Sequence, residues 1–156
     1  MSWIKIYWNC EYQGLTLPQV LFKNPGWFFW MVREEKFENK GQIAKEAEEL
    51  NRKARRIRIP DKEGKNLVAD YYVQPSGEMR FAIMEIVPEK QEPTGGHCSR
   101  KKMIDLRIPF NIKSYDKLGN SLLIKNVKGF LFQNSKLRMT RKRCEAFFDN
   151  DSNFVL

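Results

Sequence analysis

Residues 14–37 read Gly-Leu-Thr-Leu-Pro-Gln-Val-Leu-Phe-Lys-Asn-Pro-Gly-Trp-Phe-Phe-Trp-Met-Val-Arg-Glu-Glu-Lys-Phe, and this stretch sets the architecture that we expect. Thr16 is followed by Pro18, and Asn24 is followed by Pro25. A Thr or Asn side chain at an N-cap accepts a hydrogen bond from a free backbone N–H, and proline is tolerated in the first helical turn. The stretch therefore predicts two short helices joined by a tight corner.

The second of these helices is expected to run from about Gly26 to Glu35 and carries the densest apolar block in the chain. Its apolar stripe is wide, so the helix must be covered on most sides. At helical spacing one face holds Trp27, Trp30, Met31 and Glu34, with Phe28 and Val32 beside it and Phe29 reaching round it.

A Gly, then a hydrophobic-Thr-Leu start, then a polar residue with proline and finally aromatics ending in Trp resembles a small domain of nucleic-acid enzymes. This domain is found at the C-terminus of exodeoxyribonuclease X and in small stand-alone relatives, including phage proteins. The resemblance covers residues 8–37, about a fifth of the chain. It implies a nucleic-acid partner and a phage or mobile-element context.

The usual opening of that family is a strand ending in Phe-Gly-Lys-x-Lys-Gly, and this chain departs from it at residues 9–14. Tyr12 and the final Gly14 fit the pattern. The family's first Gly and both Lys positions are occupied by Cys10, Glu11 and Gln13. Any phosphate contact that these lysines make in the family is therefore not carried over to this chain.

Composition predicts one globular domain of 156 residues with a proper core, because 42% of the residues are hydrophobic and 13% aromatic. No run of about 18 apolar residues is present, so no membrane partner is expected. Residues 1–5 lack the apolar core of a signal peptide. Three scattered cysteines do not make a disulfide framework. We therefore expect a cytoplasmic protein.

Charge is the strongest global signal, and it is uneven along the chain. Residues 1–51 hold six basic and seven acidic side chains, whereas residues 52–156 hold 22 basic and 12 acidic ones. A basic surface is what a polyanion such as DNA or RNA requires of its partner. The alternative interpretation is a chain that is simply rich in lysine.

The expected fold class is α+β, in three consecutive parts. Residues 1–55 should be mostly helical after an N-terminal strand from Ser2 to Trp8. Their last helix, from Gln42 to Arg55, ends in the basic residues Arg52, Lys53, Arg55 and Arg56, which either contact phosphate or form a solvated helix end.

Residues 56–112 should form an antiparallel meander of three to four strands. Leu67 to Val73 and Met79 to Val87 alternate as strands around a turn at Pro75–Gly77, and apolar residues on both faces of the second strand favour a central place for it. A further strand is expected at Met103 to Ile108. Residues 88–102 between the last two strands are predicted to form a flexible basic loop.

Residues 113–156 should form a basic helical segment. Ser114 is the expected cap of one helix and Thr140 the cap of the last, in which Cys144, Phe147 and Phe148 would face inward. Just before that helix, residues 136–143 include five basic side chains and no acidic one.

Two catalytic or metal-binding interpretations were weighed. His97, Cys98, Cys10 and Cys144 could supply soft ligands, but zinc sites usually use paired ligands at short spacing, so neither metal nor cofactor is expected. Asp70, Glu85 and Asp105 on neighbouring expected strands could converge on the metal of a nuclease. Since Glu85 is not followed by the lysine of restriction-type nucleases, we favour outward polar residues and a non-catalytic protein.

The preferred function is non-catalytic binding of DNA or RNA through backbone phosphates. Trp3 or Tyr72 could stack on bases, although core packing suits both better. The alternatives are a protein-interaction or inhibitor module with an acidic protein partner, and a metal-dependent nuclease. The candidate phosphate contacts are Arg100, Lys101 and Lys102 in the basic loop and Arg138, Arg141, Lys142 and Arg143 near the last helix.

Overall fold

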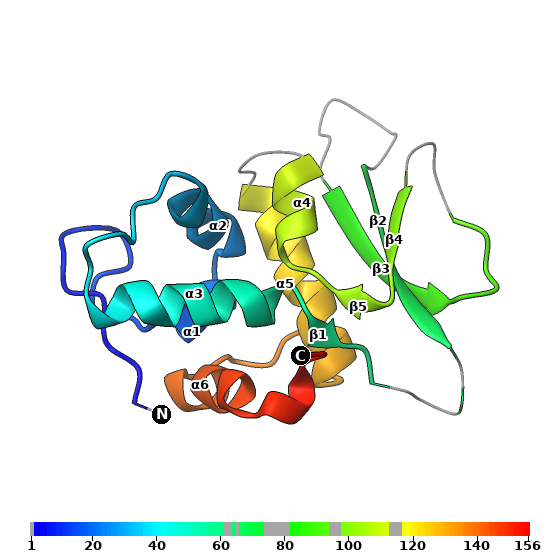
Figure 1. Ribbon diagram of the computed structural model, residues 1–156. Coiled ribbons are helices and arrows are strands. Elements are labelled where there is room, and N and C mark those ends of the chain that lie inside the picture. Colours follow the sequence, from blue (N-terminus) through cyan, green and yellow to red (C-terminus); the bar gives the residue numbers. More distant parts are fainter. Residues whose placement is uncertain (1, 61–63, 65, 74–81, 94–97, 113–116) are drawn as a thin grey trace.

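The computed structural model describes residues 2–60, 64, 66–73, 82–93, 98–112 and 117–156, and its helices and antiparallel strands confirm the α+β class (Figure 1). In chain order its elements are α1 (Leu17–Leu21), α2 (Pro25–Arg33), α3 (Gln42–Ala54), β1 (Ile57–Arg58), β2 (Leu67–Val73), β3 (Ala82–Pro88), β4 (Cys98–Lys101), β5 (Met103–Ile104), α4 (Arg107–Ile112), α5 (Lys117–Leu131), α6 (Arg141–Asp149) and the 3-10 turn η1 (Asp151–Asn153).

Both helix starts expected in residues 14–37 are confirmed. Thr16 precedes α1, and its backbone N–H donates to the side-chain oxygen of Gln19 at 3.0 Å, one half of a capping box. Asn24 precedes α2, and its Oδ1 accepts from the backbone N–H of Trp27 at 3.0 Å. These caps fix the corner between the two helices.

The buried face of α2 is rotated from the expected one. Phe28 and Phe29 are buried, whereas Trp27 and Trp30 are only partly buried. The helix packs against α1, α3 and α4, so its phenyl rings fill the space between these helices. The larger indole of Trp27 lies at the margin, edge-on to the ring of Tyr12 at 4.9 Å.

The expected strand from Ser2 to Trp8 is wrong. In this segment, which the structure describes, strand pairing is limited to one isolated antiparallel bridge between Lys5 and Thr16. Ile6 donates a backbone hydrogen bond to Leu15 at 2.8 Å and accepts one from Gly14 at 2.9 Å. Gly14 has a φ of 89°, which closes the chain back on itself too soon for a longer ladder.

The three-stranded sheet has the order β3-β2-β4, so the expected meander order is wrong. A meander would place the middle strand of the sequence in the middle of the sheet, but here β2 pairs on both sides and β3 lies at an edge. The difference arises because Cys98–Lys101, expected to be part of a loop, forms β4 on the free edge of β2. The expected turn at Pro75–Gly77 lies outside the described residues.

The expected strand from Met103 to Ile108 is also wrong beyond its first two residues. Only Met103–Ile104 is extended, and it pairs with β1 in a separate two-stranded sheet. The chain then turns into α4, because Oδ1 of Asp105 accepts from the backbone N–H of Arg107 at 2.8 Å and stabilises the helix start. Pro109 sits in the first turn of α4, where it needs no N–H partner.

The C-terminal part is helical as expected, although Ser114 lies outside the described residues. Figure 1 shows α1, α2 and α3 on one side, the three-stranded sheet on the other and α5 running between them. Thr140 caps α6, which buries Cys144, Phe147 and Phe148. One cluster of buried side chains extends from Trp3 to Phe154 and joins both sides of the molecule.

Candidate nucleic-acid interface

The start of α6 brings basic side chains of the C-terminal segment together. Oγ1 of Thr140 accepts from the backbone N–H of Arg143 at 3.2 Å, so the helix begins directly at Arg141. Its first turn contains no acidic residue. Later in the helix, Phe147 and Phe148 are buried and anchor it to the core.

A cavity of about 640 Å³ opens beside this turn. Its walls combine the apolar side chains of Leu131, Phe132 and Phe147 with the basic side chains of Arg58, Lys142 and Arg143. No carboxylate is among the described residues that line it. The cavity can therefore attract an anion without repulsion from its own walls.

Two of the three cations, Arg58 and Arg143, are held by backbone carbonyl oxygens, so no carboxylate offsets their positive charge. Arg58 donates through Nε to the carbonyl oxygen of Ser152 at 3.3 Å and through Nη2 to that of Phe154 at 3.1 Å. Arg143 donates through Nη1 to the carbonyl oxygen of Arg138. Carbonyl oxygens orient a guanidinium without neutralising it, which leaves its remaining N–H groups available to a phosphate.

Lys142 is exposed, and it forms no ion pair within the part of the chain that the structure describes. Its neighbour Arg141 differs, because Nε of Arg141 lies 2.7 Å from Oε2 of Glu145. Glu145 also accepts from the hydroxyl of Thr16 at 3.0 Å. Arg138 is exposed and contributes its carbonyl oxygen to Arg143. Of the four sequence-predicted residues here, only Lys142 and Arg143 line the cavity.

The other predicted group, Arg100 to Lys102, does not form a flexible basic loop. Arg100 lies on β4 and binds Asp70, with Nε 2.6 Å from Oδ1 and Nη2 2.9 Å from Oδ2. Because the side chain of Asp70 is fully buried, this bidentate pair holds the sheet together. Lys101 and Lys102 are exposed. Lys101 lines a second cavity beside α3 rather than the one at α6.

The carboxylates considered for a nuclease do not converge. Asp70 is directly opposite Glu85 in the sheet, on one face of β2. The backbone N–H of Asp105 donates to the hydroxyl of Tyr71, which points to the other face, at 2.7 Å. The expectation of outward polar residues is wrong for two of the three acids, since Asp70 is 0% and Asp105 7% exposed, whereas Glu85 is partly exposed.

The described residues contain no group of three or more potential metal ligands, and the side chain of Cys98, considered as a zinc ligand, is not among them. His97 lies outside the described part of the chain. Cys144 is buried, and burial raises the pKa of its thiol to about 12. This thiol is therefore a packing group rather than a nucleophile or ligand at neutral pH.

The two aromatic side chains considered for base stacking are buried. Trp3 is 3% exposed and donates through Nε1 to Oδ1 of Asp149 at 3.0 Å. Tyr72 is 9% exposed and donates its hydroxyl proton to Oε1 of Glu85 at 2.6 Å. Both therefore serve the packing of the protein.

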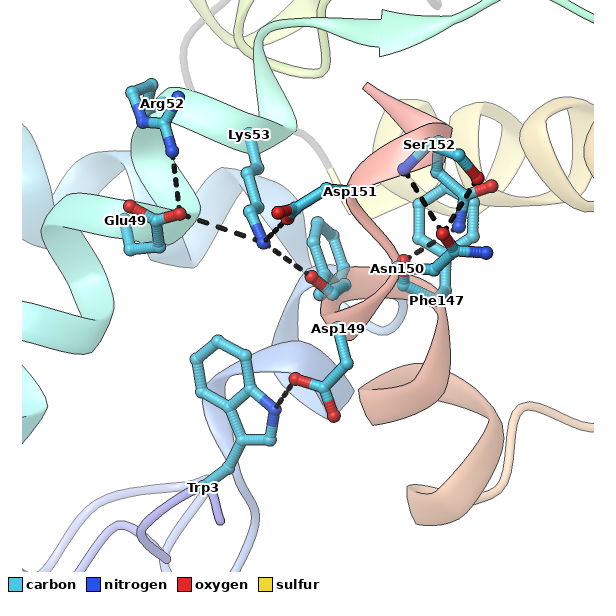
Figure 2. A network of polar contacts seen from close by, with 11 residues as sticks. Trp3, Glu49, Arg52, Lys53, Phe147, Asp149, Asn150, Asp151 and Ser152 are labelled. Atoms are coloured by element: carbon cyan, nitrogen blue, oxygen red, sulfur yellow. Dashed lines mark hydrogen bonds and ion pairs between the residues drawn. The ribbon is translucent and has the colours of Figure 1, made fainter. Parts of the chain in front are cut away.

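One cation of the basic end of α3 is structural. Lys53 donates through Nζ to the carbonyl oxygen of Phe148 at 2.8 Å and lies 2.9 Å from Oδ1 of Asp151 and 3.6 Å from Oε1 of Glu49. Figure 2 shows Lys53 at the centre of this network, between α3 and the end of α6. Its side chain is 8% exposed, so it is not available to a phosphate.

Of the basic residues that line the cavity at α6, Arg58 was not predicted from the sequence. It alternates with buried Ile57 and therefore had to point outward from β1. This alternation was a usable signal for exposure. The position of Arg58 beside α6 could not be predicted from the sequence, because it depends on the bridge between Ile57 and Phe154, which are far apart in the chain.

Comparisons of the chain with models of protein families, with curated proteins and with solved structures found no match. None of the helices in the described residues is long and apolar enough to cross a membrane. The interpretation of the site therefore depends on its geometry and charge.

We expect Asp105 to make the protein less stable as the pH rises from about 3.8, the ordinary pKa of this carboxyl, through the higher pKa that it has in the folded state. Burial raises the pKa of this carboxyl above its ordinary value of 3.8, although Arg107, Arg55 and Lys101 act in the opposite direction. A raised pKa in the folded state gives stability that is present below the unfolded pKa and lost as the pH rises through the folded pKa. Urea unfolding at several pH values measures this dependence.

The matched variant is Asp105→Asn, whose amide oxygen can still accept from Arg107. It should show a flatter dependence of unfolding free energy on pH than the wild type. Glu46, whose pKa is also raised by burial, contributes in the same direction and remains in both proteins. An unchanged slope in Asp105→Asn would contradict the assignment to Asp105.

Proposed function

We propose that the protein binds nucleic acid through backbone phosphates, without catalysis, at the cavity beside the start of α6. The observation that carries the proposal is the lining of this cavity, in which Arg58, Lys142 and Arg143 meet no carboxylate among the described lining residues. Phosphate contacts of this kind supply most of the sequence-independent affinity for nucleic acid.

Three further features support this proposal. The chain carries a net charge of +9 at pH 7, with the excess in residues 52–156. The free backbone N–H groups in the first turn of α6 attract anions in the same direction as the side chains do. The resemblance of residues 8–37 to the exodeoxyribonuclease X domain points to the same class of partner. We propose binding rather than cleavage because Asp70 is neutralised by Arg100 and faces away from Asp105.

The experiment is fluorescence anisotropy with labelled single- and double-stranded DNA and RNA at about 50 and 200 mM salt. Three phosphate contacts should weaken binding about fortyfold across this range. Lys142→Ala/Arg143→Ala should weaken binding at low salt and reduce the salt slope by about one for each cation removed.

The matched control is Lys36→Ala/Lys90→Ala, which removes the same charge from exposed positions that line none of the described cavities. It should retain much more affinity than the α6 variant. Equal losses in the two double variants would show a response to net charge alone and would reject the site. Absence of binding at the lower salt would reject the function, and an acidic protein partner would then be sought.

A further inference from the structure

A second cavity, also of about 640 Å³, lies along the side of α3. Its other wall is formed by Lys101 at the end of β4, Met103 in β5 and Asp105 just after β5. Five basic and three acidic side chains line it, so its walls carry a net positive charge. It shares no lining residue with the cavity at α6 and is independent of the proposed nucleic-acid site.

Two unsatisfied polar atoms belong to side chains that line this cavity. In the described residues, three buried side-chain atoms have no hydrogen-bond partner: Oδ1 of Asn51, Nε of Arg55 and Nε of Arg107. Asn51 and Arg55 line the cavity directly. The third residue, Arg107, does not line the cavity. Since buried donors and acceptors are ordinarily paired, these two atoms mark the cavity as a candidate ligand site.

The charges around Asp105 are unbalanced in favour of an anion. Arg107, Arg55 and Lys101 all act electrostatically on this carboxylate. Asp105 therefore interacts with three cations, and its Oδ1 already accepts from the backbone N–H of Arg107 at 2.8 Å. With five basic and three acidic side chains, the lining as a whole leaves an excess of two positive charges that would stabilise a further anion.

The protein backbone holds these groups in place without a ligand. The carbonyl oxygen of Ala54, at the end of α3, accepts from the backbone N–H of Leu106 at 3.0 Å. The hydroxyl of Tyr71 accepts from the backbone N–H of Asp105 at 2.7 Å. These two bonds fix Arg55 and Asp105 on facing elements, so the cavity does not need to be assembled by its ligand.

We propose that this cavity binds a small phosphate monoester that also carries a hydroxyl or amino group. A phosphate dianion offers enough oxygens for two guanidinium groups and an ammonium group at once, which a carboxylate does not. The orphaned oxygen of Asn51 is an acceptor and requires a donor on the ligand. The volume is within the range of small-molecule sites and far exceeds that of phosphate alone, so the phosphate should carry an organic group.

The test is isothermal titration calorimetry of the full chain with AMP, adenosine and inorganic phosphate. AMP should bind, inorganic phosphate should bind more weakly, and adenosine should bind at least tenfold more weakly than AMP. Arg55→Gln and Lys101→Ala should each weaken AMP binding at least tenfold. Asp105→Asn should tighten it, because a like charge is removed while the acceptor for Arg107 is kept.

The control is Lys36→Ala, an exposed lysine outside this cavity, which should leave the affinity for AMP unchanged. The proposal is overturned if neither AMP nor phosphate binds at millimolar concentration, or if adenosine binds as tightly as AMP. It is also overturned if Lys101→Ala has no larger effect than Lys36→Ala. Lys101 is exposed, so its variant remains informative if Arg55→Gln fails to fold.

Discussion

Replacing Arg100 by alanine is expected to lower the free energy of unfolding by about 3–5 kcal/mol, the usual cost of leaving a buried charge without its partner. The carboxylate that loses its partner is Asp70, which is fully buried in the central strand of the sheet. The same guanidinium also donates to the carbonyl oxygens of Glu89 at 3.0 Å and Gln91 at 2.7 Å, and thereby holds the chain after β3 against β4. Urea unfolding of both proteins measures the difference.

Two variants test this explanation for Arg100. Lys102→Ala, at an exposed neighbouring position, should stay within about 0.5 kcal/mol of wild type. Asp70→Asn/Arg100→Ala should be more stable than Arg100→Ala, because an unpaired neutral amide costs less to bury than an unpaired carboxylate. If Arg100→Ala costs no more than Lys102→Ala, the ion pair is not structural and Arg100 becomes a candidate for phosphate contact again.

Phe148→Ala is expected to lower the free energy of unfolding by about 3–5 kcal/mol, because it opens a cavity in a well-packed aromatic cluster. The ring of Phe148 is 0% exposed. It stacks on the ring of Phe154, with 5.7 Å between the ring centroids. Its centroid lies 5.3 Å from that of Phe147 and 5.6 Å from that of Phe22. Thermal and urea unfolding should both show the loss.

The control for Phe148 is Tyr7→Ala, which removes an aromatic ring that is 58% exposed and should change stability far less. The Phe148 variant also tests the cavity at α6. Phe148 anchors α6 to the core, and α6 carries Lys142 and Arg143. Phe148→Ala should therefore weaken nucleic-acid binding at temperatures where the protein is still folded. A loss below about 1 kcal/mol would contradict the packing described here.

Local signals in the sequence predicted the starts of α1, α2 and α6, although α4 was expected to be part of a strand. Thr16, Asn24 and Thr140 each precede a helix, since an N-cap depends on contacts within three residues and is written in the local sequence. The inward positions of α6 were readable for the same reason. Burial of Phe28 and Phe29 in preference to Trp27 was not, because it depends on which neighbours α2 meets.

Strand partners and charge partners were much less predictable. The alternation of β2 was readable, but its place at the centre of the sheet depends on β4, whose sequence favours a loop. Arg100 looked like a phosphate contact because its partner Asp70 is 30 residues away in the chain. The basic residues of α6 are different, because the helix start that exposes them is local.

The contact between the beginning and the end of the described chain has a consequence for synthesis. Trp3 bonds to Asp149, 146 residues later, and Phe154 is part of the same core as Trp3. A ribosome adds about 5–20 residues per second. The apolar faces of α1, α2 and α3 are therefore exposed for on the order of ten seconds before α6 and Phe154 have been synthesised and can pack against them. During that time Phe28 and its neighbours are open to chaperones and to other nascent chains, and low temperature or slow translation of residues 140–154 would prolong the exposure.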